Sequence, residues 1–382
     1  MLTGMPTKIL ARIAAQTGLP RLFPVLSQDL SGSDLQSLLL EVYRARVPAI
    51  GGPELLERAA RDLVAPSAVD PRVFLEFDRT AFEVAAGFEA LELAPVAPLG
   101  LNHALGGIDQ NNVLTTIRNV EVLGDPTPAM ALECARRRKQ GPRPALPEVR
   151  FAASQRVIRL QPFDFPGYSP HFKLFALASA GRDTGSHAFE IQRLGEHIRF
   201  YLELFRGLNA RGFHLANPLV EISDAAVTGA LLEHAGVSQV QLREQVRAHR
   251  VGGSERFLEE RGVKLPDSVQ EPARELPDWA PSGRLEVVRT GLVGVLRDEF
   301  PEAQFRFNLA RLEGLSYYAG LCLRISPEAP DGNRYPITDG GFTDWTARLL
   351  ADRKERFLAT GIGSEFVCRR YRSTSTETSC EQ

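Results

Sequence analysis

Histidine and cysteine, the side chains that most often hold metals or act as nucleophiles, are few and scattered in this chain of 382 residues. The seven histidines include no H-E-x-x-H pair, and they are better interpreted as satisfied core or surface residues than as metal ligands. The cysteines form neither a C-x-x-C pair nor a zinc spacing, which indicates reduced thiols in a cytoplasmic protein. They are Cys134, Cys322, Cys368 and Cys380.

Other familiar signatures are missing from the sequence as well. It contains no phosphate-binding G-x-x-x-x-G-K-[ST] loop, no G-x-G-x-x-G and no G-x-S-x-G elbow. A formal net charge of -2 argues against a strongly basic nucleic-acid binder. The basic residues 136–139 favour a solvated helix end or linker over an RNA contact. No apolar run approaches the roughly 18 residues of a membrane span, and no signal peptide is expected.

The spacing of apolar residues predicts an α+β fold, in which helices cover an antiparallel sheet. Residues 1–68 form a helical N-terminal extension, with an amphipathic helix over residues 30–47. Residues 69–370 form the core, which carries a helical insertion at about residues 224–284. Residues 371–382 are polar and are expected to be disordered.

Within the core, β-branched runs and helical periodicity predict alternating strands and helices. We expect strands at residues 90–97, 113–117, 120–123, 156–160, 172–178, 219–222, 304–309 and 317–325. We expect helices at residues 73–86, 126–138, 188–209, 224–262, 285–300 and 344–358.

The most distinctive stretch is residues 307–320, FNLARLEGLSYYAG. It resembles the histidine-recognition strand of histidyl-tRNA synthetases, R-G-L-D-Y-Y-T-G, and more closely the matching stretch of the ATP phosphoribosyltransferase regulatory subunit. Other segments resemble further motifs of this class II family in the family's order. They are residues 123–131 (L-R-P-[ED]-x-T-A-P-V-A), 157–161 and 171–175 (motif 2 and its returning strand), 338–344 (G-G-R-Y-D) and 361–366 (motif 3, G-x-G-x-E-R).

The resemblance implies a damaged activation site. Class II cores bind ATP with Mg²⁺ and aim fixed cations at its phosphates. Arg159 matches the motif 2 arginine and Gln161 stands for the motif 2 glutamate, whereas Phe366 and Glu313 occupy positions of family arginines. Losing one such donor costs on the order of 100- to 1000-fold in rate. The nearby Arg311 and Arg369 are not expected to substitute, because the backbone would have to shift.

The same resemblance implies a better preserved amino-acid pocket. Asp125 matches the residue that holds the ligand's α-ammonium, and Thr127 lies beside it. Tyr317 and Tyr318 are consecutive, so only one is expected to point inward; a half-buried strand pair is the alternative. Ser316 replaces a family Asp or His, which leaves the ligand's side chain open. Gly340 and Gly341 allow either close approach of a ligand or a simple turn.

These observations predict a catalytically degenerate synthetase paralogue that binds an amino-acid-like ligand and regulates a partner enzyme, as the phosphoribosyltransferase subunit does in histidine biosynthesis. The chain ends about 16 residues after its motif 3-like segment, before any anticodon-binding domain. A homodimer through residues 82–98 is implied by resemblance alone. The alternatives are an ATP-dependent ligase that forms an acyl-adenylate, with Arg159 as its catalytic residue, and an RNA-binding paralogue.

Overall fold

The computed structural model describes residues 6–59, 62–140, 148–161, 169–238, 240–242, 253–315 and 317–372. Its centre is a sheet of eight strands in the order β1-β4-β5-β10-β9-β8-β6-β7. The strands are β1 (Glu89–Leu91), β4 (Val149–Ile158), β5 (His171–Arg182), β6 (Ala216–Asp224), β7 (Gln304–Phe307), β8 (Tyr318–Glu328), β9 (Thr338–Thr343) and β10 (Glu355–Ile362).

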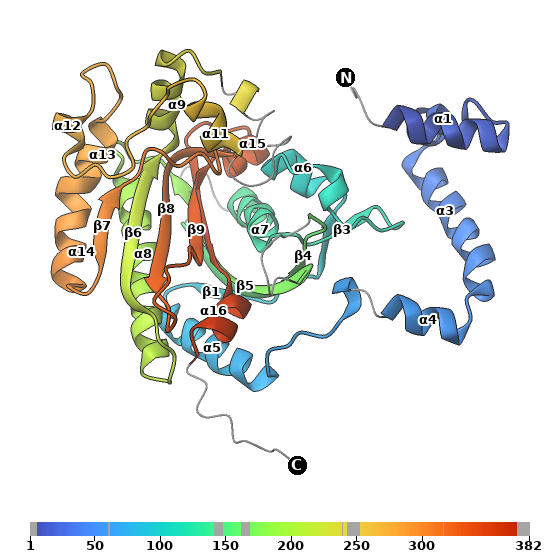
Figure 1. Cartoon of the computed structure of the whole chain (residues 1–382), viewed down its shortest axis with the longest axis horizontal. Helices are drawn as coiled ribbons and strands as arrows, with labels where there is room; N and C mark the ends of the chain where they lie inside the picture. The colour runs from blue at the N-terminus through green and yellow to red at the C-terminus, as the bar shows by residue number, and fades with distance from the viewer. Residues whose placement is uncertain are drawn as a thin grey trace.

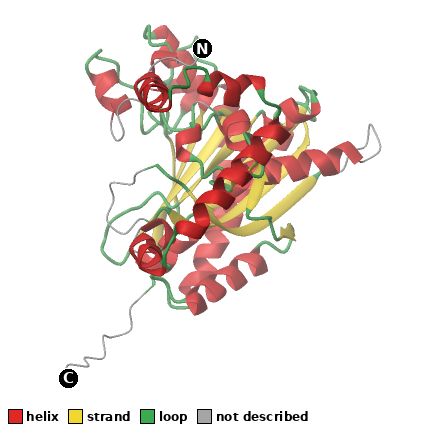
Figure 2. Cartoon of the chain, turned by 90° about the vertical axis from the view of Figure 1, so that its right-hand side faces the viewer, coloured by secondary structure: helices red, strands yellow, loops and turns green. Residues whose placement is uncertain are grey.

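The predicted α+β class and its sheet flanked by helices are confirmed (Figures 1 and 2). The inner strands pair antiparallel, whereas the two edge pairs, β1 with β4 and β6 with β7, are parallel. A small second sheet pairs β2 (Val96–Pro98) with β3 (Val120–Val122).

One face of the sheet is covered by α5 (Pro71–Val84), α8 (Ala188–Asn209), α13 (Gly283–Val288) and α14 (Gly294–Glu299). Side chains alternate along β5, so Phe175 and Leu177 join this layer. The Phe175 ring stacks on Phe200 of α8 at 5.7 Å and meets Phe77 of α5 edge-on at 6.5 Å. These aromatic contacts fix the long helix against the middle of the sheet.

The opposite face carries α6 (Leu101–Gly106), α7 (Pro126–Gln140) and α15 (Trp345–Leu350). The alternate β5 residues Ala176 and Ala178 belong to this second core with Met130 of α7 and Trp345 of α15. Small side chains on β5 bring the helices close to the sheet, and this layer frames the cavity described below.

The N-terminal helices lie to one side of the sheet and its layers (Figure 1). They are α1 (Pro6–Thr17), α2 (Leu22–Pro24), α3 (Gly32–Arg46) and α4 (Gly52–Ala59). Ser31 caps α3 by accepting a hydrogen bond from the Asp34 backbone. The side chains of Leu38, Val42 and Tyr43 on α3 are exposed. Asn119, in the turn before β3, donates to Gln36 of α3 at 3.1 Å.

Between β6 and α13 the described residues include α9 (Ala225–His234), α11 (Gly253–Glu259) and α12 (Pro272–Glu275). Leu232, Phe257 and Leu265 build a small apolar cluster with Leu312, which follows β7. This helical segment thus packs against the loop that leads to β8.

Several secondary-structure predictions were wrong. The single strand expected at residues 90–97 is two strands in different sheets, β1 and β2, and the helix expected over residues 224–262 ends at His234. The helix expected over residues 344–358 ends at Leu350, because Ala351 adopts a left-handed φ of 52°, and the chain then enters β10 at Glu355. The strand expected at residues 113–117 forms only a bridge between Thr115 and Glu121. Val113 is buried there without pairing in a strand, so its β-branched side chain reflects packing and not a strand.

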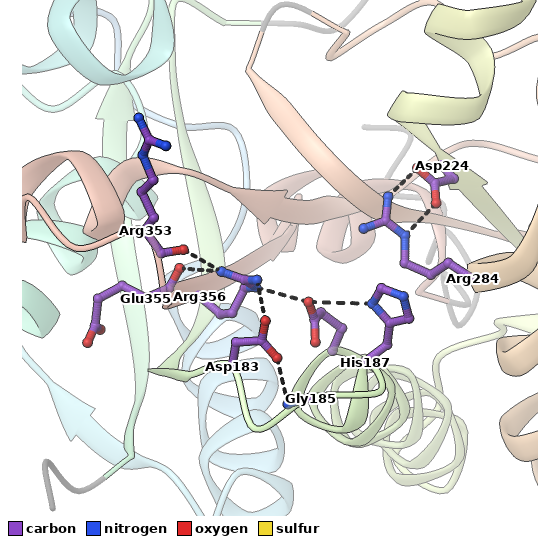
Figure 3. A network of polar contacts seen from close by, with 9 residues as sticks. Asp183, Gly185, His187, Asp224, Arg284, Arg353, Glu355 and Arg356 are labelled. Carbon is purple, nitrogen blue, oxygen red and sulfur yellow. Dashed lines mark hydrogen bonds and ion pairs between the residues drawn. The ribbon is translucent and has the colours of Figure 1, made fainter. Parts of the chain in front are cut away.

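Ion pairs hold the ends of the inner strands β5, β10 and β6 at one end of the sheet (Figure 3). Arg356 of β10 donates to Asp183 at 2.7 Å and to Glu190 of α8 at 3.0 Å. Close by, Arg284 of α13 donates through two nitrogens to the buried Asp224 at the end of β6, both at 2.6 Å. Such doubly hydrogen-bonded guanidinium–carboxylate contacts hold both orientation and distance.

Candidate functional site

A cavity of about 630 Å³ lies over the middle of the sheet, on the side of α6, α7 and α15. It is lined by the segment that begins α7, the residues that follow β4, the starts of β8 and β9, the end of β10, and α16 (Ser364–Arg370). All the residues predicted for the ligand site line it except Gly341: Asp125, Thr127, Arg159, Gln161, Tyr317, Tyr318 and Gly340. The fold therefore gathers residues that are up to about two hundred positions apart in the chain.

Asp125 is held rigidly at the start of α7. Its Oδ1 accepts hydrogen bonds from the Thr127 backbone at 2.8 Å and from the Thr127 hydroxyl at 2.7 Å, as in a helix cap. Its Oδ2 accepts from Arg159 Nη2 at 3.0 Å, and Arg159 Nε donates to the Gly124 carbonyl at 2.7 Å. The Arg159 guanidinium also lies over the Phe172 ring, 5.2 Å from its centroid. The cavity thus contains a half-exposed carboxylate–guanidinium pair.

Two buried polar atoms in the cavity lining were missed from the sequence. The amide nitrogen of Asn102 donates to the buried Glu121 at 2.8 Å, which fixes the orientation of the Asn102 side chain. Asn102 Oδ1 then has no partner in the described part of the chain, and neither does the indole Nε1 of Trp345, a residue only 4% exposed. Because buried polar groups are normally satisfied, these atoms offer an acceptor and a donor to a polar ligand. Nothing in the sequence patterns singled them out.

Tyr317 and Tyr318 both line the cavity, so the expectation that only one points inward was wrong. Strand alternation does not apply, because Tyr317 lies in the turn before β8. The backbone nitrogens of both tyrosines donate to the Gly314 carbonyl, at 3.0 and 2.8 Å, and the two ring centroids are 4.4 Å apart. Gly314 has a left-handed φ of 85°, and a Cβ there would come within 2.4 Å of the Tyr318 ring. Ser316 lies outside the described residues.

Asp339 of β9 was not identified from the sequence, although its carboxylate lines the cavity. Its Oδ1 accepts from Arg311 Nη2 and, at 3.0 Å, from the Tyr318 hydroxyl. Arg311 does not line the cavity: its side chain is 2% exposed and also donates to the Leu323 carbonyl at 2.9 Å. Arg311 therefore lies behind Asp339, as a buried counter-charge. The sequence signal that could have identified Asp339 is its position directly before Gly340 and Gly341.

Gly340 and Gly341 lie inside β9, so the alternative that they form a simple turn was wrong. A Cβ on Gly340 would come within 2.4 Å of the Ala359 carbonyl oxygen, and a Cβ on Gly341 within 2.5 Å of the Cys322 Cβ. The neighbouring strands β10 and β8 fill the space that a side chain would need. Both glycines are explained by close packing within the sheet, and Gly340 alone of the two lines the cavity.

The family motifs imply arginines at the positions of Phe366 and Glu313, and the end of the cavity near α16 differs from this pattern. Phe366 lines it and packs edge-on against Tyr335, with centroids 5.3 Å apart. Glu313 is not among the lining residues; its exposed carboxylate pairs with Arg324 at 3.2 Å. Arg369, which was not expected to substitute for a family arginine, lines the cavity. It lies three residues after Phe366 on a helix, where positions i and i+3 share a face without any shift of the backbone.

The lining does not fit a nucleoside triphosphate well. Its charged side chains in the described residues are the cations Arg159 and Arg369 and the anions Asp125, Asp339 and Glu365. Glu365 is buried and already accepts from Arg156 Nη1 and the Lys173 backbone, both at 3.0 Å. No group of three or more histidine, cysteine or acidic side chains in the described part of the chain could hold a metal ion. We therefore derive no step through ATP or Mg²⁺ at this site.

Residues 136–139 end α7, and their arginines are engaged in ion pairs. Arg136 pairs with Glu133 at 2.6 Å and Arg137 with Glu89 at 2.8 Å. Arg138 was expected to be solvated with the rest of the run but is 0% exposed, because it extends inward to Glu355.

Cys134, Cys322 and Cys368 are buried free thiols, and Cys380 lies outside the described residues. Among the described helices, none has the length and hydropathy to cross a bilayer.

Comparison with known proteins identifies the fold but not a sequence family. No protein-family model matches the sequence, and no curated protein matches it. Among solved structures, an ATP phosphoribosyltransferase regulatory subunit/histidyl-tRNA synthetase from Bacillus halodurans C is similar, with a TM-score of 0.58 and 15% identity over 80% of this chain and 82% of that one.

Two more structures agree with the first. A histidine–tRNA ligase subunit from Alicyclobacillus acidocaldarius has a TM-score of 0.57 and 16% identity over 80% of this chain and 95% of its own. Histidyl-tRNA synthetase from Nostoc sp. PCC 7120 has a TM-score of 0.56 and 19% identity over 80% and 73%. This chain has the class II histidyl-tRNA-synthetase-like fold. At these identities the likeness establishes the fold alone, so the activity is inferred from the cavity itself.

Proposed function

We propose that this synthetase-like chain binds a small amino-acid-like ligand in its cavity without activating it, and that ligand binding regulates a partner enzyme. The observation that carries the proposal is the Asp125–Arg159 pair within a cavity otherwise lined largely by apolar and aromatic groups. An α-amino acid carries the complement of both charges on neighbouring atoms.

The geometry supports an exchange of partners on binding. The ligand's α-ammonium takes the place of Arg159 on Asp125, whose orientation Thr127 already fixes. Asn102 Oδ1, which lies 4.0 Å from the position that a Cβ on Gly124 would take, supplies a second acceptor near Asp125. Arg159, freed from Asp125, then binds the ligand's carboxylate, a group that a guanidinium can bind through two nitrogens. The ligand's side chain extends toward Tyr317 and Tyr318.

Several features support binding without activation. Acyl-adenylate formation needs cations around a reacting phosphate. Phe366 is apolar, Glu313 lies outside the cavity, and the lining has more carboxylates than guanidiniums. A site with these charges favours the zwitterion and disfavours the triphosphate.

Regulation of a partner enzyme is supported by one of the similar structures, which is named a phosphoribosyltransferase regulatory subunit. If this chain has the same role, ligand binding in its cavity would shift the equilibrium between two arrangements of the surface that it shares with the partner enzyme. We place the protein in the cytoplasm as a homodimer formed through residues 82–98, with a partner of the phosphoribosyltransferase type in histidine biosynthesis. Affinity purification with and without added amino acids tests this part, and the proposal predicts one co-purifying enzyme whose activity depends on the ligand.

A second candidate function is an ATP-dependent ligase that forms an acyl-adenylate. The observation in its favour is Arg369, a guanidinium that lines the cavity near Phe366. In this reaction a ligand carboxylate oxygen bonds to the α-phosphorus of ATP, and pyrophosphate leaves with the electrons of the broken bond. Amino-acid-dependent exchange of labelled pyrophosphate into ATP would establish this function, provided that Arg369→Ala abolishes the exchange. No exchange with any of the common amino acids favours the binding protein.

A further inference from the structure

We infer that the cavity selects α-amino acids whose side chain ends in a positively charged nitrogen, and that Asp339 binds that nitrogen. The inference rests on the proposed function, because it assumes that the α-amino acid part of the ligand is held at Asp125 and Arg159. It adds the chemical class of the ligand and the residue that determines it.

The first observation is the unequal use of the two Asp339 oxygens. Oδ1 accepts from both Arg311 and the Tyr318 hydroxyl. Oδ2 has no hydrogen-bond partner in the described part of the chain, and the side chain is 45% exposed although it lines a cavity. The protein therefore orients this carboxylate through one oxygen and leaves the other to accept from a ligand.

The second observation is how firmly Asp339 is held. Arg311 is buried and is itself anchored on the Leu323 carbonyl at 2.9 Å. It lies 5.3 Å from the centroid of the Tyr318 ring, whose hydroxyl completes the triangle with Asp339. A carboxylate held by two donors, one of which is itself anchored, needs little reordering when it binds, which favours affinity and selectivity.

The third observation is that Asp339 and Asp125 line the same cavity as Tyr317, and that both lie close enough to influence its hydroxyl. Burial raises the pKa of Tyr317, and the negative charges of Asp339 and Asp125 raise it further, so both carboxylates act on the same hydroxyl. Tyr318 is 4.4 Å and Trp345 6.5 Å from Tyr317, centroid to centroid. A ligand with its α-ammonium on Asp125 and a second nitrogen on Asp339 would pass along these rings.

A charged nitrogen suits this end of the cavity better than a neutral or acidic group. Hydrogen bonds from a cationic donor to a carboxylate are about twice as strong as neutral ones. The faces of the tyrosine rings also attract cations. An acidic side chain would face Asp339 with like charge. Arg311 neutralises part of the Asp339 charge, so the preference depends on the free oxygen and the rings together.

The test compares L-lysine with L-norleucine by calorimetric titration of the full-length protein. The two ligands share the α-amino acid part and a four-carbon chain, and they differ in the terminal ammonium. We expect lysine to bind at least about tenfold more tightly, the ratio that one charge-assisted hydrogen bond provides. In Asp339→Asn the ratio should fall to near one while norleucine affinity is unchanged. Asp344→Asn, an exposed aspartate outside the cavity lining, should keep the wild-type ratio.

The outcomes distinguish a failure of the inference about Asp339 from a failure of the proposed amino-acid binding. If norleucine binds as tightly as lysine, or if the lysine preference persists in Asp339→Asn, the inference fails and the proposed amino-acid site stands. If no α-amino acid binds, the proposed function fails and the inference with it. The wild-type comparison needs no variant, so a folding defect in Asp339→Asn, revealed by circular dichroism, would not remove the test.

Discussion

Arg159 and Asp125 come from different elements and meet in the cavity, with Arg159 Nη2 3.0 Å from Asp125 Oδ2. Asp125 is fixed by Thr127 just before α7, whereas Arg159 follows β4 and is linked to Gly124 and to the Phe172 ring. Each residue therefore has a support of its own, and the pair can separate without unfolding either element. That property makes it a suitable receptor for a zwitterion.

Asp125→Asn tests the ammonium end of this receptor. The amide keeps the shape but loses the charge, so we expect amino-acid affinity to fall at least roughly tenfold in calorimetric titration. Glu83→Gln, on the exposed face of α5 and paired with Arg79, serves as the control and should bind as the wild type does. Unchanged affinity in Asp125→Asn would place the ammonium elsewhere.

Arg159→Ala tests the exchange of partners. An amino acid loses its carboxylate contact and should bind roughly tenfold more weakly. The corresponding amine, which lacks the carboxylate, should bind as well as before or better, because Arg159 no longer competes for Asp125. Parallel titrations with both ligands distinguish this mechanism from general damage, which would weaken both alike.

The buried ion pair of Arg138 and Glu355 joins the end of α7 to the start of β10, and Arg138 Nη2 donates to Glu355 at 2.9 Å. Removing one charge from a fully buried pair leaves the other uncompensated. We expect Glu355→Gln to lower the free energy of unfolding by about 3–5 kcal/mol, measured by urea denaturation. Glu83 is exposed and pairs with Arg79 and Arg211, so Glu83→Gln should lower the free energy of unfolding much less than Glu355→Gln does. Equal stabilities would mean that the buried pair contributes little.

His197 provides a pH-dependent test of the core beneath the cavity. Burial lowers its pKa to about 3, with Arg193 adding to the effect, while its ring nitrogens contact Ser179 and Thr360, both at 2.9 Å. The unfolded chain binds a proton near pH 6.5 that the folded chain does not. The contribution of His197 to stability is therefore complete above pH 6.5 and declines toward pH 3, by about 1.4 kcal/mol per pH unit.

The matching variant is His197→Gln, which does not titrate. Between pH 6 and pH 5 the free energy of unfolding of the wild type should fall more steeply than that of the variant. Thr360 lines the cavity and also accepts from Tyr201 at 2.8 Å, so the same variant shows whether this network influences ligand binding. Parallel pH profiles for the two proteins would show that His197 is protonated in both folded and unfolded chains or in neither.

Apolar periodicity, a local signal, predicted the helix over residues 188–209 and most strands of the sheet. The gathering of Asp125, Arg159 and Tyr317 was predicted from the resemblance to the synthetase motifs. It did not predict Asp339, Asn102 or Trp345 as lining residues. Their importance arises from which oxygen or nitrogen remains without a partner after the strands have paired, and this property depends on contacts distant in sequence. β10 was missed for a similar reason: the turn at Ala351 ends a helix whose periodicity continued in the sequence.

The most direct test of the account is calorimetric titration of the full-length protein with each common α-amino acid, repeated in the presence of ATP. We predict saturable binding of at least one amino acid, with an affinity that ATP leaves unchanged. The account would be contradicted if no amino acid bound, or if binding required ATP, since the cavity would then be either unrelated to amino acids or part of an activating enzyme.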